Sequence, residues 1–444
     1  MADERPPPRL FQVLVAPLQA FLRTEAKGGI LLLLAALTAL GLANSPWRKA
    51  WHAFWELPLH LGLGDRMVEG SLHFVVNDVL MAIFFFVVGL EIKRELVRGE
   101  LRTPAQALLP AIAAVGGMLV PALIFVAFQQ GGDGVRGWAI PMATDIAFSI
   151  GCLALLGNRI PHALKVFLTA LAIFDDIGGI LVIALFYGTG IQPMGLLWTV
   201  LAAAAVLGLN RLSIQGPVPY LVGGVALWFA FHAAGLHPTL AGVVLGLLVP
   251  ADSALAPAEI LTGLKRRLDE RVVSVGAQLS ADELAGAGQA LAALCSPLDR
   301  FEYAIHPWVA YAIMPLFALA NSGVEIGGLH AGDFLSPVFL GIALGLFAGK
   351  TVGIFVFTWG AVAAKLSRVP GGAPWVQVLG VGSVAGIGFT VALFIANLAF
   401  AGAPLLLDEA RLGILAGSAL SGTVGMLVLR FLPGRATAPT PATV

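Results

Sequence analysis

Long runs of apolar residues with few polar interruptions dominate the chain. A helix needs about 20 mainly apolar residues to cross the hydrocarbon core of a bilayer, and most of these runs approach or exceed that length. The pattern therefore predicts an all-α integral membrane protein with about twelve transmembrane helices. The predicted spans are residues 28–43, 71–90, 104–128, 137–157, 162–187, 193–209, 216–234, 237–250, 300–320, 335–360, 375–401 and 408–430.

The spans form two blocks separated by one long polar segment. Residues 28–250 hold spans 1–8, and residues 300–430 hold spans 9–12. Residues 251–299 contain the stretch KRRLDER and many alanines and glycines, which predicts a cytoplasmic loop. A regulatory domain is the alternative for this loop, although nothing in it indicates a ligand or a catalyst. We expect a cytoplasmic N-terminal lead-in at 1–27 and a disordered cytoplasmic tail at 431–444.

Composition excludes several classes of protein. Of the 444 residues, 58% are hydrophobic and only 12% are charged, whereas soluble domains carry about 25% charged residues. The formal net charge is zero, so no overall basic field indicates a nucleic-acid partner. Cys152 and Cys295 lie far apart and form no disulfide framework, redox motif or metal-binding spacing.

The distribution of Lys and Arg predicts the orientation of the chain. If the spans alternate in direction, 20 of the 26 basic residues fall on the side that holds both termini, and 5 fall on the opposite side. Lys350 lies inside a span. Because cytoplasmic loops are rich in Lys and Arg, we expect both termini in the cytoplasm.

Five charged residues lie deep inside the predicted spans, away from their ends: Asp78, Asp145, Asp175, Asp176 and Lys350. An ionised side chain near the bilayer centre costs about 2.5–3.5 kcal/mol on insertion scales, so each of these needs a partner or a wet cavity. An internal salt bridge that holds helices together is one interpretation. It does not suffice for both adjacent acids, because neighbouring side chains on a helix point about 100° apart and one lysine cannot neutralise the two.

The adjacent acids Asp175 and Asp176 indicate a site for a small cation or for protons. Two neighbouring carboxylates with a third supply the hard oxygen ligands that small cations prefer. Burial and mutual repulsion favour a protonated carboxyl group, which can exchange its proton for a metal ion. Gly178 and Gly179 follow the acids after a single residue and leave space for water or for close packing.

Two spans contain proline or glycine interruptions. Span four reads WAIPMATDIAFSIG, with Pro141 before Thr144 and Asp145. Span eleven contains GSVAGIGFT, in which Gly382, Gly386 and Gly388 lie close together. Corresponding interruptions predict discontinuous helices whose free ends carry partial charges at the midplane. Ordinary kinks and tight helix packing are the alternative.

Several charged residues near the ends of spans are weaker candidates. The segment LEIKREL contains Glu91, Lys93, Arg94 and Glu95, and its default interpretation is a solvated helix end with ion pairs. Glu302, His306 and His237 also lie near span ends. Histidines at such places are commonly interfacial, but they titrate near neutral pH and can act as pH sensors.

In these motifs the chain resembles the NhaA family of bacterial sodium/proton antiporters, over about residues 20–430. The resemblance rests on NDVLMAIFFFVVGLEIKREL, AIPMATDIAF, ALAIFDDIG, HPWVAY, PLFALANSGV, the GK of span ten and GIGFT, taken in their order along the chain. It implies a twelve-helix fold with an inverted repeat, in which spans three to five mirror spans ten to twelve and two discontinuous helices cross.

The resemblance also implies roles for individual residues. Asp176 and Asp175 match the ion-binding and proton-carrying aspartates of the family, and Thr144 and Asp145 match residues on the broken helix, where Asp145 also offsets helix-end charge. Lys350 matches a buried lysine that can pair with Asp175 and carry a proton. The positions that match residues linked to pH response are Asp78, Glu91, Glu95, His237 and Glu302.

This sequence departs from better-known members of the family in three places. The loop at 251–299 is longer, Tyr303 stands where a histidine can occur, and the proline-rich start is extended. The loop joins the cytoplasmic face on which the pH-linked positions lie, so the pH at which transport switches on does not follow from the resemblance.

The sequence thus predicts a secondary active transporter and not an enzyme. It would export Na⁺, and Li⁺, in exchange for H⁺ by alternating access, with cation and protons competing for the buried aspartates, and transport would be electrogenic and pH-regulated. No cofactor is expected, because the ions Na⁺, Li⁺ and H⁺ are the substrates. The expected surroundings are the lipid of a bacterial inner membrane, without nucleic acid, and the sequence is compatible with a homodimer.

Three other functions stay open from the residues alone. A sodium-coupled solute symporter could share crossed, broken helices. An intramembrane aspartyl protease would also use two carboxylates, although its usual YD and GxGD settings are absent from this sequence. A passive cation channel would differ from an antiporter by the lack of proton coupling.

Overall fold

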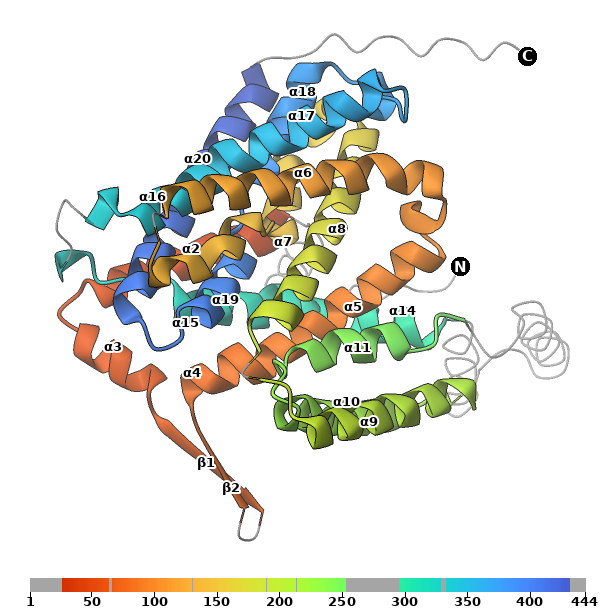
Figure 1. Cartoon of the computed structure of the whole chain (residues 1–444), viewed down its shortest axis with the longest axis vertical. Helices are drawn as coiled ribbons and strands as arrows, with labels where there is room; N and C mark the ends of the chain where they lie inside the picture. The colour runs from red at the N-terminus through yellow and green to blue at the C-terminus, as the bar shows by residue number, and fades with distance from the viewer. Residues whose placement is uncertain are drawn as a thin grey trace, which may run out of the picture. The chain divides into compact units, whose positions relative to one another are not determined.

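The structure is a computed structural model that describes residues 26–63, 66–129, 131–188, 190–212, 214–252, 295–328 and 333–431. The predicted lead-in at 1–27, the loop at 251–299 and the tail at 431–444 lie almost wholly outside the described residues. The chain forms two compact units, coloured along the sequence in Figure 1. Unit 1 comprises Met1–His73, Thr103–Val182 and Met314–Val444, and unit 2 comprises Phe74–Arg102 and Ile183–Ile313.

Helices build nearly all of the described part of unit 1. The elements are α2 (Ala26–Ala43), α3 (Arg48–Trp55), β1 (Pro58–Leu63), β2 (Arg66–Ser71), α6 (Pro104–Phe128), η4 (Asp133–Met142), α7 (Ile146–Leu155), η5 (Gly157–Arg159), α8 (His162–Phe186, which ends in unit 2), α15 (Met314–Asn321), η7 (Ile326–Gly328), η8 (Asp333–Leu335), α16 (Pro337–Leu344), η9 (Gly345–Gly349), α17 (Lys350–Ala363), η10 (Pro370–Gly372), α18 (Trp375–Ala385), α19 (Phe389–Ala399) and α20 (Pro404–Phe431).

Unit 2 is also helical in its described part. Its elements are η2 (Val75–Leu80), α5 (Met81–Val97), η3 (Glu100–Arg102), α9 (Pro193–Arg211), α10 (Pro217–Ala233), α11 (Leu240–Leu248), α14 (Pro297–Trp308) and η6 (Val309–Ile313). The short helix α4 (Leu72–Phe74) joins the two units in sequence.

Each of the twelve predicted spans coincides with a helix, with a run of consecutive helical segments or with a bent pair of helices. Among the described residues, seven helical runs are long and apolar enough to cross a membrane, and three bent pairs raise the number to ten. The other two predicted spans correspond to α10, with 17 residues, and α11, with only nine. At 1.5 Å per residue, α11 is about 14 Å long, which is less than half of a hydrocarbon core of about 30 Å.

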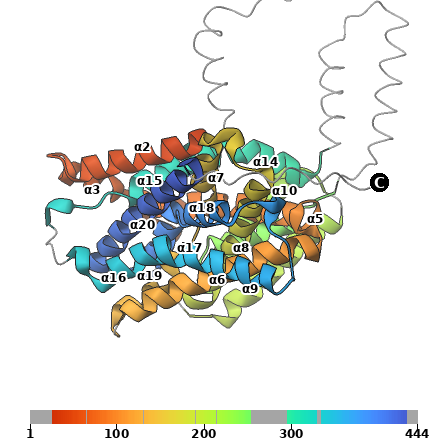
Figure 2. The ribbon, with the colours of Figure 1, turned by 90° about the horizontal axis from the view of Figure 1, so that it is seen from above.

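Small residues let the helices of unit 1 approach closely. Figures 1 and 2 both show α17 between α6 and α18. A Cβ atom added to Gly353 of α17 would lie 2.2 Å from the carbonyl oxygen of Gly116 on α6. Such close backbone contact is the usual way in which helices associate in a membrane, where lipid tails compete for apolar side chains.

The same packing holds α5 and α11 together in unit 2. A Cβ atom on Gly242 of α11 would lie 2.1 Å from the carbonyl oxygen of Ala82, and one on Gly246 would lie 2.7 Å from that of Phe86. A third glycine on the facing helix, Gly89, is equally close to Val243. The short helix α11 is therefore fixed by backbone proximity along its whole length.

Two spans of unit 1 are broken where the sequence predicts it. The axes of η4 and α7 differ by 41°, and those of α18 and α19 differ by 44°. The first break falls at residues 143–145, after Pro141, and the second falls at residues 386–388, which include Gly386 and Gly388. Four helix ends thus lie inside unit 1 instead of at its surface.

The segment between the first two predicted spans folds into elements that the apolar pattern does not predict. Helix α3 turns by 119° from α2, and an antiparallel hairpin follows, in which Pro58 pairs with Ser71 and Leu63 pairs with Arg66. Charged and apolar residues mix in α3 and in the hairpin, so neither has the uninterrupted apolar run that predicts a span.

Candidate functional site

A buried ion pair lies inside unit 1. The Nζ atom of Lys350, at the start of α17, lies 2.9 Å from Oδ2 of Asp175 on α8, and neither side chain is exposed to solvent. The pairing implied by the family resemblance is therefore present. An internal salt bridge accounts for this lysine and for one of the two adjacent acids.

The hydroxyl group of Thr144 joins the broken helix of span four to this ion pair. Its Oγ1 atom lies 2.7 Å from Oδ2 of Asp175 and 3.0 Å from the carbonyl oxygen of Ala385, the last residue of α18. A hydroxyl has one proton to donate, so these two acceptors compete for it. Thr144 thereby connects the first break, the second break and the acidic helix α8.

Both carboxylate oxygens of Asp145 are used by helix N-termini. Oδ1 accepts a hydrogen bond of 3.0 Å from the backbone N–H of Phe148 and so caps α7. Oδ2 accepts from the backbone N–H of Thr390 at 3.2 Å and from its hydroxyl at 2.5 Å, at the start of α19. Helix N-termini carry partial positive charge, so one buried negative charge stabilises two half-helices at once.

The C-terminal ends at the two breaks are satisfied in a complementary way. Lys350 donates a hydrogen bond to the carbonyl oxygen of Met142, the last residue of η4. The hydroxyl of Ser149 donates to the carbonyl oxygen of Val384 at 3.1 Å, near the end of α18. The backbone N–H of Asp145 donates to the carbonyl oxygen of Ile387 at 2.7 Å. A positive side chain thus lies at a helix C-terminus and a negative one at two N-termini, as helix dipoles require.

One carboxylate oxygen of the site is buried without a hydrogen-bond partner among the described residues. Oδ1 of Asp175 is buried and accepts no hydrogen bond in the described part of the chain. Asp176, the next residue on α8, is 8% exposed. An unpartnered buried carboxylate oxygen is costly, and a cation or a proton would satisfy it.

Among the described residues, the predicted third carboxylate, that of Asp145, forms no three-acid cluster with Asp175 and Asp176. Asp145 is engaged by α7 and α19, and the described residues contain no cluster of three His, Cys, Asp or Glu side chains that could hold a metal ion. A small cation beside Asp175 and Asp176 would therefore take its further oxygen ligands from hydroxyls, backbone carbonyls or water.

The glycines near the site differ in their surroundings. A Cβ atom on Gly386 would lie 2.4 Å from the carbonyl oxygen of Leu346, and one on Gly388 would lie 2.7 Å from the side chain of the same leucine. After the acidic pair, Gly178 faces the sulfur of Met118, whereas nothing lies within 4 Å of a Cβ atom on Gly179. Close packing explains three of these glycines, and open space surrounds the fourth.

The five residues with predicted links to pH response all belong to unit 2, where they form two groups. Asp78 lies in η2, and its Oδ1 atom is 3.9 Å from Nε2 of His237. In the second group Glu302 and Glu95 share Arg94, which forms ion pairs with both. Glu91 lies one turn before Glu95 on α5.

Two polar residues beside the breaks were not among the candidates from sequence. Thr390 and Ser149 carry the contacts described above with Asp145 and with the end of α18. Thr390 ends the motif GIGFT, so a hydroxyl that begins a helix after a glycine break was a usable signal. Ser149 had no such signal, because serine is common in membrane helices.

Comparison with known proteins places this geometry in a family. The family model described as Na+/H+ antiporter 1 matches residues 19–429. The chain is 52% identical to the Na(+)/H(+) antiporter NhaA of Anaeromyxobacter sp. (strain Fw109-5), over 100% of this chain and 98% of the relative. It is 51% identical to Na(+)/H(+) antiporter NhaA 1 of Myxococcus xanthus (strain DK1622), over 97% and 96% of the two chains.

A relative from Rhodospirillum rubrum, also named Na(+)/H(+) antiporter NhaA, is 47% identical over 93% of this chain and 98% of its own length. These matches cover the broken helices, the paired aspartates and the buried lysine, and they confirm the resemblance seen in the motifs. The chain belongs to the Na+/H+ antiporter 1 family.

Proposed function

We propose that the chain exchanges Na⁺ for H⁺ at the buried cluster of Asp175, Asp176, Thr144 and Lys350. The observation that carries this assignment is the unpartnered, buried oxygen Oδ1 of Asp175, which lies on a carboxylate already paired with Lys350. A cation or a proton bound there completes the oxygen's interactions, and the two exclude each other by charge. Competition for one site couples the two fluxes without a nucleotide or another cofactor.

Lys350 supports the exchange by replacing the cation. When no Na⁺ is bound, its ammonium group neutralises Asp175 at 2.9 Å, and both side chains are fully buried. A bound Na⁺ would take over that role and repel the ammonium group, which favours release of a proton from Lys350 or from Asp176. More than one titratable group at the site is sufficient for electrogenic exchange.

Asp145 and Thr144 hold the two broken helices beside the site. Asp145 fixes the starts of α7 and α19, and Thr144 donates a hydrogen bond either to Asp175 or to the end of α18. The acceptor that the Thr144 hydroxyl uses depends on whether the site holds a cation. A cation on Asp175 weakens that carboxylate as an acceptor, so the Thr144 hydroxyl then favours Ala385.

The orientation of the chain follows from the charge of the loops. With 20 of the 26 Lys and Arg residues on the side of the termini, both termini are cytoplasmic in our assignment. The ion gradients set the direction of exchange, so an inward proton gradient drives Na⁺ out of the cell as H⁺ enters. Li⁺ is a second substrate of the same charge. The homodimer stays a prediction, for which the mass of the protein in detergent is the measurement.

The two groups of charges in unit 2 are our candidates for the pH response. The Asp78–His237 contact is an ion pair only when the histidine is protonated. The Glu95–Arg94–Glu302 group, with Glu91 near it, makes α5 and α14 sensitive to the charge on three acids. Transport chemistry itself stays in unit 1.

Everted membrane vesicles test the exchange site directly. Addition of Na⁺ should discharge a preformed proton gradient in the wild type, and Asp176→Asn should abolish the discharge because a neutral amide binds neither ion strongly. Asp133→Asn is the matched control, because Asp133 is exposed at the start of η4. Undiminished exchange by Asp176→Asn, at equal protein content in the membrane, would overturn the site assignment.

The same vesicles separate the antiporter from a sodium-coupled symporter. No organic solute is present in the assay, so exchange under these conditions excludes an obligatory co-substrate. A passive channel would carry Na⁺ without proton coupling. It would therefore not show a discharge of the proton gradient that saturates with Na⁺ and depends on the carboxylates.

A further inference from the structure

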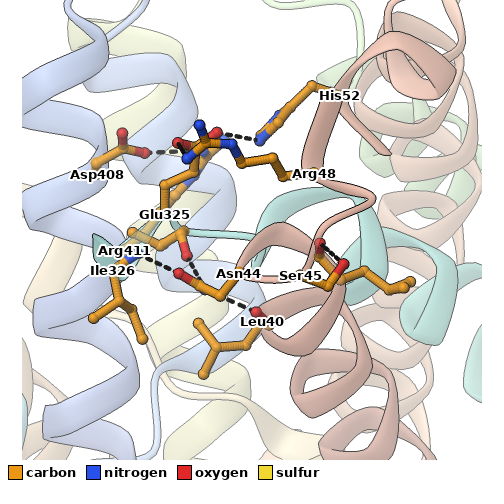
Figure 3. A network of polar contacts seen from close by, with 11 residues as sticks. Leu40, Asn44, Ser45, Arg48, His52, Glu325, Ile326, Asp408 and Arg411 are labelled. Carbon is orange, nitrogen blue, oxygen red and sulfur yellow. Dashed lines mark hydrogen bonds and ion pairs between the residues drawn. The ribbon is translucent and has the colours of Figure 1, made fainter. Parts of the chain in front are cut away.

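A polar network lies at the end of unit 1 where α2 ends and α20 begins. In Figure 3, Glu325 lies between α3, which contributes Arg48 and His52, and α20, which contributes Asp408 and Arg411. Nε2 of His52 is 3.1 Å from Oε1 of Glu325, and Nη1 of Arg48 is 3.7 Å from Oε2. In the orientation assigned above, this end is extracytoplasmic.

Asn44 fixes the segment that carries Glu325. The side-chain amide of Asn44 donates to the carbonyl oxygen of Val324 at 2.7 Å, and its Oδ1 atom accepts from the backbone N–H of Ile326 at 2.6 Å (Figure 3). The segment after α15 is thus bound to the end of α2 on both sides of Glu325. Asn321, the last residue of α15, is itself held by a hydrogen bond of 2.9 Å from its side chain to the carbonyl oxygen of Phe317.

The network reaches the broken helix α19 through one side chain, Asn397. Its Nδ2 atom donates to Oδ1 of Asn321 at 2.7 Å, and its Oδ1 atom accepts from Nη2 of Arg411 at 3.3 Å. The two ends of one amide group therefore join α19 to α15 on one side and to α20 on the other. Arg411 is also paired with Asp408, its neighbour three residues earlier, at 3.3 Å.

Asn397 lies on the same face of α19 as Thr390, which holds Asp145. Seven residues separate the two, which is about two turns, so their side chains leave the helix in nearly the same direction about 10 Å apart. Helix α19 has only 11 residues and begins at the break. A helix this short moves as a rigid rod, so a displacement at Asn397 also displaces the donors of Thr390.

A second contact, with α20, also joins the start of α19 to its surroundings. Near the break, the backbone N–H of Phe389 donates to Oγ of Ser418 on α20 at 3.2 Å. Arg411 lies seven residues before Ser418 on α20 and Asn397 eight residues after Phe389 on α19, so the two antiparallel helices are joined at both ends of α19. At the break, α20 holds α19 by this one neutral hydrogen bond, and Asp145 holds the N–H and the hydroxyl of Thr390. All of these contacts lie at the start of α19, so the angle of the helix also depends on the contacts at its other end.

We propose that Asn397 is a positioning residue of the exchange site, which sets the angle of α19 through Asn321 and Arg411 and so fixes the Thr390 donors on Asp145. This inference rests on the proposed function, because it assumes that the Asp145 crossing shapes the cation site. A loosened α19 weakens the arrangement into which Na⁺ binds, while the titrating acids on α8 are unchanged. The consequence is weaker Na⁺ binding with a preserved maximal rate.

The test compares Asn397→Leu with Asn44→Ala in proteoliposomes, with the rate measured against Na⁺ concentration and normalised to the amount of protein. Asn397→Leu, which removes both hydrogen bonds at similar volume, should raise the KM for Na⁺ about tenfold and change kcat less than about threefold. Asn44→Ala, which breaks the same network away from α19, should leave the KM for Na⁺ within about twofold.

Two results would overturn the inference. One is a wild-type KM in Asn397→Leu, and the other is an equal rise in KM in both variants, since each would mean that the network stabilises the fold without positioning α19. If Asn397→Leu does not reach the membrane, Asn397→Ser takes its place, because a hydroxyl is too short to contact both partners.

The outcome is separable from that of the proposed function. Active Asp176→Asn refutes the exchange site whatever the Asn397 variants do. Inactive Asp176→Asn together with a wild-type KM in Asn397→Leu refutes only the positioning role.

Discussion

The Lys350–Asp175 pair gives the sharpest test of how charge is balanced inside unit 1. The two charged atoms are 2.9 Å apart and neither side chain is exposed, so solvent screens their attraction little. At an effective dielectric constant of about 20, this separation corresponds to an attraction of about 6 kcal/mol. Removal of one partner leaves the other charge buried and uncompensated, which costs about 3–5 kcal/mol of folding free energy.

The perturbation is a double-mutant cycle of Lys350→Met and Asp175→Asn. Each single change should destabilise the protein by about 3–5 kcal/mol, whereas the double change removes both charges and restores most of that loss. A residual cost of about 1 kcal/mol should remain, because the carbonyl oxygen of Met142 loses the hydrogen bond from Lys350 in both variants that lack the lysine.

Thermal unfolding of the purified protein in Na⁺-free detergent buffer measures this cycle, with the fluorescence of its nine tryptophans as the signal. Melting temperatures should fall in both single variants and recover in the double variant. Additive losses in the double variant would refute the reasoning, because they would show that the two side chains do not compensate each other. Transport should stay low in the double variant even though stability returns.

Two further predictions concern the crossing of the broken helices. Gly386→Ala should destabilise the protein by about 1–3 kcal/mol, because the new Cβ atom would lie 2.4 Å from the carbonyl oxygen of Leu346. Gly360→Ala is the control, because nothing lies within 4 Å of its Cβ atom. Equal melting temperatures in the two variants would contradict the prediction. Asp145→Asn should lower the free energy of unfolding by about 2 kcal/mol, because it removes the charge that faces two helix N-termini. Asp133→Asn, at an exposed position, is the control in the same melting experiment. A loss of stability no larger than that of the control would argue against the capping of two helices by Asp145.

The membrane-spanning helices and their breaks could be predicted from sequence because both depend on local composition. An apolar run has to form a helix in lipid, since no water is present to satisfy its backbone. Pro141 and the pair Gly386 and Gly388 disturb such helices locally, so the breaks were visible as well. The hairpin at Pro58–Ser71 was not, because it depends on pairing between two short segments of mixed polarity.

The partners within the site could not be derived from the residues alone. Asp145 and Thr390 are 245 residues apart in sequence, and Asn321 and Asn397 are 76 apart. Nothing in the local pattern around Asn397 distinguishes it from any polar residue near a helix end. The Lys350–Asp175 pair was available only through family resemblance, because burial of a charge predicts that a partner exists but does not say which one.

Because Asp145 caps two helices, the number of residues at each break is constrained. Extended segments between helices usually accept inserted residues, because their backbone is exposed and makes few hydrogen bonds. Here the backbone N–H of Asp145 is bonded to Ile387, and its carboxylate is bonded to α7 and α19. One residue added at either break would move a helix start away from the Asp145 carboxylate that caps it, so the two short segments tolerate no change in length unless both change together.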